Sequence, residues 1–103
     1  MKYERKRYIA FSFEKSINVN DLKKQFSKVY VSLYGILNYN LYSIKLFIKY
    51  GVIFVSSPVS SLYESLVAFT IAYYNLTGKF PCFKGIYPTV KSAARKLGAV
   101  EES

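Results

Sequence analysis

The stretch that decides the fold is LYSIKLFIKYGVIFVS, residues 41–56. Its first ten residues alternate between an apolar face and a mixed face, and a period of two is typical of a strand buried on one side. The two faces are Tyr42, Ile44, Leu46, Ile48 and Tyr50 against Ser43, Lys45, Phe47 and Lys49. Gly51 interrupts the pattern, and a second apolar run follows at once over 52–56. So short a connection predicts two antiparallel neighbouring strands.

An amphipathic helix is predicted on each side of these strands. Upstream, apolar residues recur at helical spacing up to residue 34, after a cap at Asn18 or Asn20 and before a stop at Gly35. The polar face of that helix carries Lys23, Lys24, Ser27 and Lys28, which we interpret as a solvated face in preference to a phosphate-binding patch.

The downstream helix is expected over 61–76 and is the most apolar element. Pro58 ends the sheet before it, and Ser60 or Ser61 is the expected cap, with Glu64 completing a capping box. A core stripe of Leu62, Leu66, Phe69, Tyr73 and Leu76 is widened by Val67, Ala68, Ile71 and Tyr74. A helix that is apolar beyond one stripe needs a second neighbour, which is either the C-terminal helix or another chain.

Two outer strands complete the pattern. Residues 7–14 alternate, with Ile9, Phe11 and Phe13 on one face and Tyr8, Ala10 and Ser12 on the other, and residues 80–87 form the last strand. The resulting βαββαβ order predicts an α+β, ferredoxin-like sandwich with a four-stranded antiparallel sheet and both main helices on one face.

An extra basic helix follows the last strand. Thr89 stands at its expected N-cap; Val90, Ala93, Ala94 and Leu97 form one face, and Lys91, Ser92, Arg95 and Lys96 form the other. Free amides and positive charge at such a helix start suit a phosphate, which favours nucleic acid. Taken alone, however, the pattern is more typical of a solvated helix with ordinary surface charges.

Length and charge set the broad class. The 103 residues predict one domain over 1–103, with a basic arm at 1–6 and a frayed tail at 99–103. Lys and Arg number 15 against 6 acids, a net charge of +9, so the expected partners are polyanions: RNA, DNA or an anionic membrane surface. Polar residues interrupt the apolar run at 50–78, so no membrane span is predicted. With no secretory signal in view, a cytoplasmic location is expected.

The residues needed for covalent catalysis are missing. There is no His, and the acids do not pair on any predicted face. Cys82 is expected to be a buried, inert thiol in the last strand. We therefore predict no catalytic residue, no metal site and no cofactor. Tyr8 and Phe47 are candidates for exposure on the sheet, but no base-stacking motif is present, so backbone recognition by Lys and Arg is the preferred mode.

Three stretches are similar to one family, the archaeal and eukaryotic ribonuclease P protein component 2. They are the opening strand at 6–11 (KRYIAF), the apolar helix at 62–74 (LYESLVAFTIAYY), and the turn into the last helix, where Thr89, Val90, Lys91 and Ala93 match the family pattern. The family usually has Ser-Gly where this chain has Tyr87 and Pro88, so a phosphate-binding turn here needs a different geometry. The resemblance covers roughly residues 6–97.

The resemblance implies an accessory subunit of a ribonucleoprotein that removes the 5′ leader of precursor tRNA. In that family, catalysis belongs to the RNA, which binds the magnesium. The resemblance implies that this protein pairs with a TIM-barrel subunit, component 3, and that the pairs dimerise into a hetero-oligomer. By analogy, the expected RNA contacts are Arg7, Lys84, Thr89, Lys91, Arg95 and Lys96, and the expected protein interface is Leu62, Tyr63, Val67, Ile71 and Tyr74.

Two other functions stay open. The fold also suits a homodimerising interaction or ligand-binding module. An acylphosphatase-like hydrolase is disfavoured, because the loop at 15–18 (KSIN) lacks the Arg that would bind the anion.

Overall fold

The computed structural model describes residues 5–35 and 44–98. It contains four strands, β1 (Lys6–Ser12), β2 (Lys45–Lys49), β3 (Val52–Pro58) and β4 (Phe83–Tyr87), in the order β2-β3-β1-β4. All neighbouring pairs are antiparallel. This is the predicted ferredoxin-like α+β fold. The expected arm before residue 5, the strand start at 41–43 and the tail at 99–103 lie outside the described residues.

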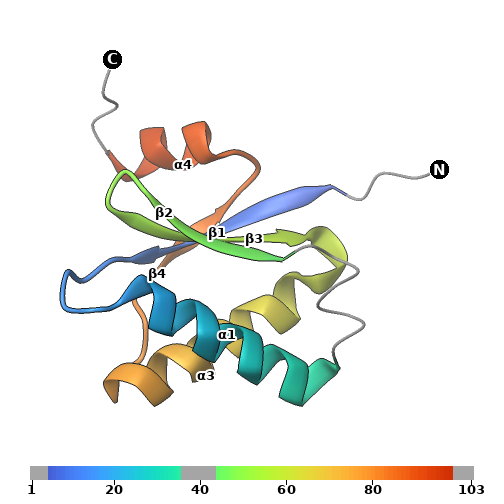
Figure 1. Cartoon of the computed structure of the whole chain (residues 1–103). Coiled ribbons are helices and arrows are strands. Elements are labelled where there is room, and N and C mark those ends of the chain that lie inside the picture. The colour runs from blue at the N-terminus through green and yellow to red at the C-terminus, as the bar shows by residue number, and fades with distance from the viewer. Residues whose placement is uncertain (1–4, 36–43, 99–103) are drawn as a thin grey trace.

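Three α-helices are described: α1 (Val19–Tyr34), α3 (Leu62–Thr77) and α4 (Val90–Leu97), with a short 3-10 helix, η1 (Val59–Ser61), before α3. Figure 1 shows α1 and α3 together on one face of the sheet and α4 on the other. Of the two cap candidates for α1, Asn18 takes the position: its side chain accepts from the backbone N–H of Asn20 at 2.9 Å and of Asp21 at 3.2 Å.

The β2–β3 hairpin turns on two residues with positive φ. Tyr50 has φ 55° and Gly51 has φ 70°, and Lys49 pairs directly with Val52 across the turn. Positive φ at both central residues is the type I′ geometry, whose twist matches that of the flanking strands. The hairpin predicted around Gly51 is confirmed.

The main core lies between the sheet and the pair α1 and α3. Ile9 and Phe11 from β1 face this core as predicted, and the Phe11 ring stacks on Phe69 of α3 with centroids 4.1 Å apart. Two hydroxyls are buried beside it: Ser65 Oγ donates to Ser57 Oγ at 3.0 Å, and Ser57 Oγ donates to the carbonyl of Pro58 at 3.0 Å. These bonds satisfy polar groups that would otherwise be costly to bury.

A second apolar cluster lies on the opposite face of the sheet, under α4. Ala10, Phe54 and Ala93 are fully buried there. Partly buried neighbours surround them, namely Tyr8, Phe47, Val52, Tyr87, Val90 and Leu97. The last helix is therefore docked on the sheet, and it is not the second neighbour of α3.

Three details differ from expectation. Ser61 takes the N-cap position of α3 without a side-chain cap hydrogen bond, so the capping box with Glu64 does not form; its place in η1 gives it a different backbone conformation. The last strand begins at Phe83, not at residue 80. Cys82 precedes it and is exposed, so the prediction of a buried thiol was wrong; only its backbone carbonyl joins the sheet, accepting from Ser12 N at 3.0 Å.

Candidate nucleic-acid interface

The start of α4 is held by a reciprocal cap. The backbone N–H of Ser92 donates to Thr89 Oγ1 at 3.0 Å, and the N–H of Thr89 lies 3.3 Å from Ser92 Oγ. This capping box satisfies two amides that have no partner within the helix. The cap predicted at Thr89 is confirmed, and Ser92, which the sequence pattern placed only on the polar face, completes it.

The cations of α4 point away from the sheet. Lys91, Arg95 and Lys96 are exposed, whereas Ala93 and Ala94 on the opposite side are buried. Arg95 and Lys96 also lie in the last helical turn, where positive charge interacts favourably with the helix dipole. The predicted division of the helix into an apolar and a basic face is therefore present.

The other two cations predicted to contact RNA, Lys84 and Arg7, lie on opposite sides of the sheet. Lys84 and Leu97 line one hollow, so Lys84 lies on the same side of the sheet as α4. Arg7 alternates with Tyr8 and shares the strand face of Ile9, which is the face of α1 and α3; its Nη1 donates to the Lys6 carbonyl at 3.0 Å. A single flat contact would not engage both Arg7 and α4.

The end of β4 leads into α4 through a tight local structure at Gly85. Gly85 has φ 125°, beside an irregularity in the β1–β4 register between Ala10 and Phe11. The Tyr87 ring folds back over it, and Tyr87 Oη donates to the Lys84 carbonyl at 2.8 Å. Only glycine leaves room for this ring, which in turn packs in the cluster beneath α4.

The sheet aromatics are covered. Tyr8 and Phe47, the two candidates for exposure on the sheet, are half-buried, because both pack against the cluster that Ala10, Phe54 and Ala93 of α4 form. Their rings meet edge to face at 6.3 Å, and Phe47 stacks on Phe54 at 5.6 Å. The structure thus groups aromatic side chains from neighbouring strands beneath the basic helix.

Two cations that the sequence did not assign to RNA belong to the same side. Lys45 and Lys49 are exposed and flank Phe47 along β2, and strand alternation puts all three on one face. The alternation over 41–50 already placed these residues together, but it did not show that α4 would bring further cations to that face.

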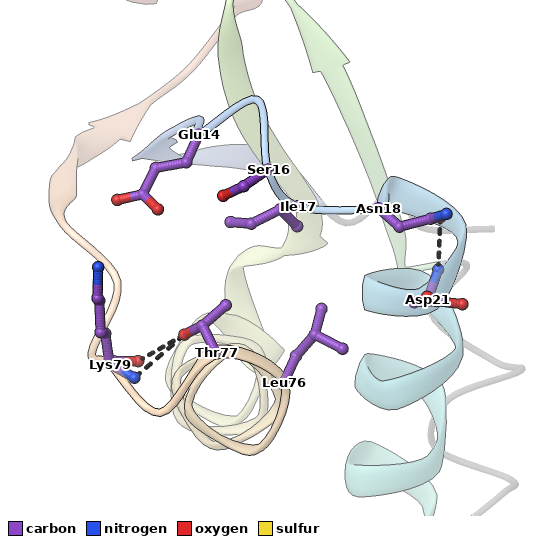
Figure 2. Close-up of a pocket in the computed structure, with 8 residues that line it drawn as sticks. All are labelled: Glu14, Ser16, Ile17, Asn18, Asp21, Leu76, Thr77 and Lys79. Carbon is purple, nitrogen blue, oxygen red and sulfur yellow. Dashed lines mark hydrogen bonds between the residues drawn. The ribbon is translucent and has the colours of Figure 1, made fainter.

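The described acids lie elsewhere. Glu14 and Asp21 line a hollow between the loop before α1 and the end of α3 (Figure 2), and Glu64 lies on α3. Two polar side chains of this hollow serve local structure: Asn18 caps α1, and Thr77 Oγ1 donates to the Tyr73 carbonyl at 2.9 Å. Over residues 5–35 and 44–98, cations therefore dominate the side of the sheet that α4 covers.

A second surface runs along the outer side of α3. Tyr63, Val67, Ile71 and Tyr74 recur at helical spacing opposite the buried Ala68 and Ala72. Tyr63 is 77% exposed and Tyr74 is 47% exposed, and Phe80 packs on Tyr74 with centroids 5.0 Å apart. Leu62, the fifth residue predicted for an interface, packs against the main core instead. Exposed apolar side chains grouped in this way are typical of an interaction surface.

Two further classes of site are absent from the part of the chain that is described. No group of three or more His, Cys, Asp or Glu is placed there to hold a metal ion, and none of the described helices has both the length and the apolar character to cross a bilayer. Comparison with models of known protein families and with curated proteins gave no match to this chain.

Proposed function

We propose that this protein binds RNA through the side of the sheet that α4 covers, and that it acts as an accessory subunit of ribonuclease P. The observation that carries the proposal is the exposed cationic face of α4, with Lys45, Lys49 and Lys84 on the same side of the sheet. Neutralising phosphates releases counterions, so such a face binds RNA in a salt-dependent way.

The assignment to ribonuclease P rests on the resemblance of residues 6–11, 62–74 and 89–93 to protein component 2, together with the ferredoxin-like topology. In this proposal the RNA carries out cleavage of precursor tRNA, with its own magnesium, and the protein supports the folded RNA. The chain alone is expected to leave precursor tRNA intact.

The outer surface of α3 is the proposed contact for the TIM-barrel component 3. Tyr63, Ile71 and Tyr74 are exposed to solvent, Val67 beside them is half-buried, and α3 carries no Lys or Arg. The alternative is a homodimerising module that uses the same surface. The net charge of +9 opposes self-association, so we expect a monomer in sedimentation at low ionic strength. A stable homodimer without affinity for RNA would favour the alternative.

The decisive experiment measures the affinity for ribonuclease P RNA at several salt concentrations. Replacing Lys91, Arg95 and Lys96 with Ala should lower the log–log slope by about 0.9 for each phosphate that the protein no longer neutralises, so by up to about 3. The matched control replaces Lys23, Lys24 and Lys28 of α1, which are also exposed but lie on the other side of the sheet. Both triple variants change the net charge equally, so equal slopes for the two would refute the assignment to α4.

A further inference from the structure

The side of the sheet beneath α4 carries an aromatic residue on every strand. They are Tyr8 on β1, Phe47 on β2, Phe54 on β3 and Tyr87 on β4. β1 and β3 are the two central strands of the sheet. Sheets that bind single-stranded RNA stack unpaired bases on aromatic side chains placed in this way. The platform therefore has the chemistry to bind bases, but α4 lies over it.

The helix α4, which covers these aromatic residues, is short and makes few buried contacts with them. α4 has eight residues, and it contacts the aromatic cluster through Val90, Ala93 and Leu97. A helix of this length is marginal on its own and depends on docking for its stability. Ala93 is its only fully buried side chain in the cluster, where it meets Ala10 and Phe54. Moving the helix away from the sheet would therefore expose little apolar surface of its own.

The surrounding charge favours a nucleic-acid strand at this place. Lys45 and Lys49 flank Phe47 on β2, Lys84 lies near the end of α4, and none of the described acids lies on this side of the sheet. A phosphate backbone running along β2 would meet cations while its bases faced the aromatic rings. Binding to single strands commonly combines such a positive groove with base stacking.

We propose that α4 is a displaceable cover over a base-stacking platform, and that unpaired nucleotides of single-stranded RNA bind Tyr8, Phe47, Phe54 and Tyr87 when the helix undocks. The inference rests on the proposed function of RNA binding and adds the class of RNA that this site takes. The apparent affinity is reduced by the fraction of molecules in which α4 is displaced, so weakening the docking should strengthen binding.

The test uses the full chain and a short single-stranded oligoribonucleotide with a central 2-aminopurine, whose fluorescence is quenched by stacking. Ala93→Gln leaves the net charge unchanged, and Gln is a good helix former. The larger Gln side chain, however, does not fit between Ala10 and Phe54, so the substitution should weaken the docking of α4. We expect it to bind the oligonucleotide about tenfold more tightly, with stronger quenching. Ser32→Gln, at an exposed position on α1, is the matched control and should change neither property.

Phe47→Leu provides an independent variant that keeps an apolar side chain beside Phe54. Because it removes a flat ring, it should weaken single-strand binding by about tenfold and leave the salt dependence unchanged. The inference is overturned if Ala93→Gln stays folded and binds no better, or if Phe47→Leu changes neither affinity nor quenching. Failure of the proposed function is a separate result, namely that the unmodified chain shows no salt-sensitive affinity for any RNA.

Discussion

Replacing Gly85 with Ala tests the link between the last strand and α4. Gly85 has φ 125°, which L side chains rarely adopt. A Cβ at this position would lie 2.8 Å from Tyr87 Oη, 3.0 Å from its Cζ and 3.1 Å from its Cε2. Because the Tyr87 ring packs in the cluster under α4, it cannot move away from the new methyl group without disturbing that cluster.

The magnitude follows from three contributions. Holding a residue other than glycine at this φ costs about 1–3 kcal/mol, and moving the ring breaks the 2.8 Å hydrogen bond from Tyr87 Oη to the Lys84 carbonyl, which contributes about 1 kcal/mol. The reduced entropy of the unfolded chain offsets about 0.4–1 kcal/mol. We therefore expect Gly85→Ala to lower the free energy of unfolding by about 2 kcal/mol.

Urea denaturation followed by circular dichroism measures this change. The matched control is Gly51→Ala, where φ is 70° and nothing lies within 4 Å of the added Cβ, so only the backbone strain of about 1 kcal/mol is expected. In a double-mutant cycle, Tyr87→Ala should remove the extra cost at Gly85 by deleting the ring. A destabilisation by Gly85→Ala no larger than that by Gly51→Ala, or a cycle without coupling, would show that the Tyr87 ring does not restrict this position.

Three further perturbations follow from the described contacts. Phe69→Ala should destabilise the fold by about 3–5 kcal/mol in the same denaturation assay, because this fully buried ring fills the main core. Thr89→Ala should cost about 1 kcal/mol by removing the cap of α4, and hydrogen exchange should show faster opening of residues 90–97 with little change in α1. Burial, and next the charge of Glu14, raises the pKa of Tyr73 above 10.0, so the native state favours the neutral phenol; stability is then complete below about pH 10 and falls as pH rises through the native pKa. Tyr73→Phe should reduce this alkaline loss in pH-dependent unfolding, whereas Tyr63→Phe, which removes an exposed hydroxyl, should not.

The elements of the fold were predictable because local rules and burial agree in them. The alternation in β1 and β2, the Asn cap before α1 and the stop at Gly35 after it each act within a few residues, and each is found in the structure. Cys82 shows the limit of such rules. The residues around Cys82 have the pattern of a strand, but β4 begins only at Phe83. The start of this edge strand is set by its pairing with β1, which a local sequence pattern does not contain.

The arrangement of the candidate site was less predictable. The basic and apolar faces of α4 are visible in its periodicity, but periodicity does not say which surface the apolar face meets. Both sides of the sheet carry aromatic residues, and α3 also has an apolar outer side, so composition alone allowed α4 to pack on α3. The connection through Gly85 and Tyr87 directs it to the sheet, and that depends on a backbone conformation that no periodic pattern encodes.

The two serine hydroxyls between β3 and α3 have a consequence for the apolar helix they join. Because α3 is apolar on opposite sides, the hydrophobic effect alone would favour burial of either side against the sheet. Turning the helix about its axis would carry Ser65 away from the sheet and leave the buried Ser57 hydroxyl with one hydrogen bond fewer. The hydrogen bond between Ser65 and Ser57 thus fixes the rotation of α3 about its axis. That rotation determines that Tyr63 and Tyr74 are the tyrosines of α3 exposed to solvent.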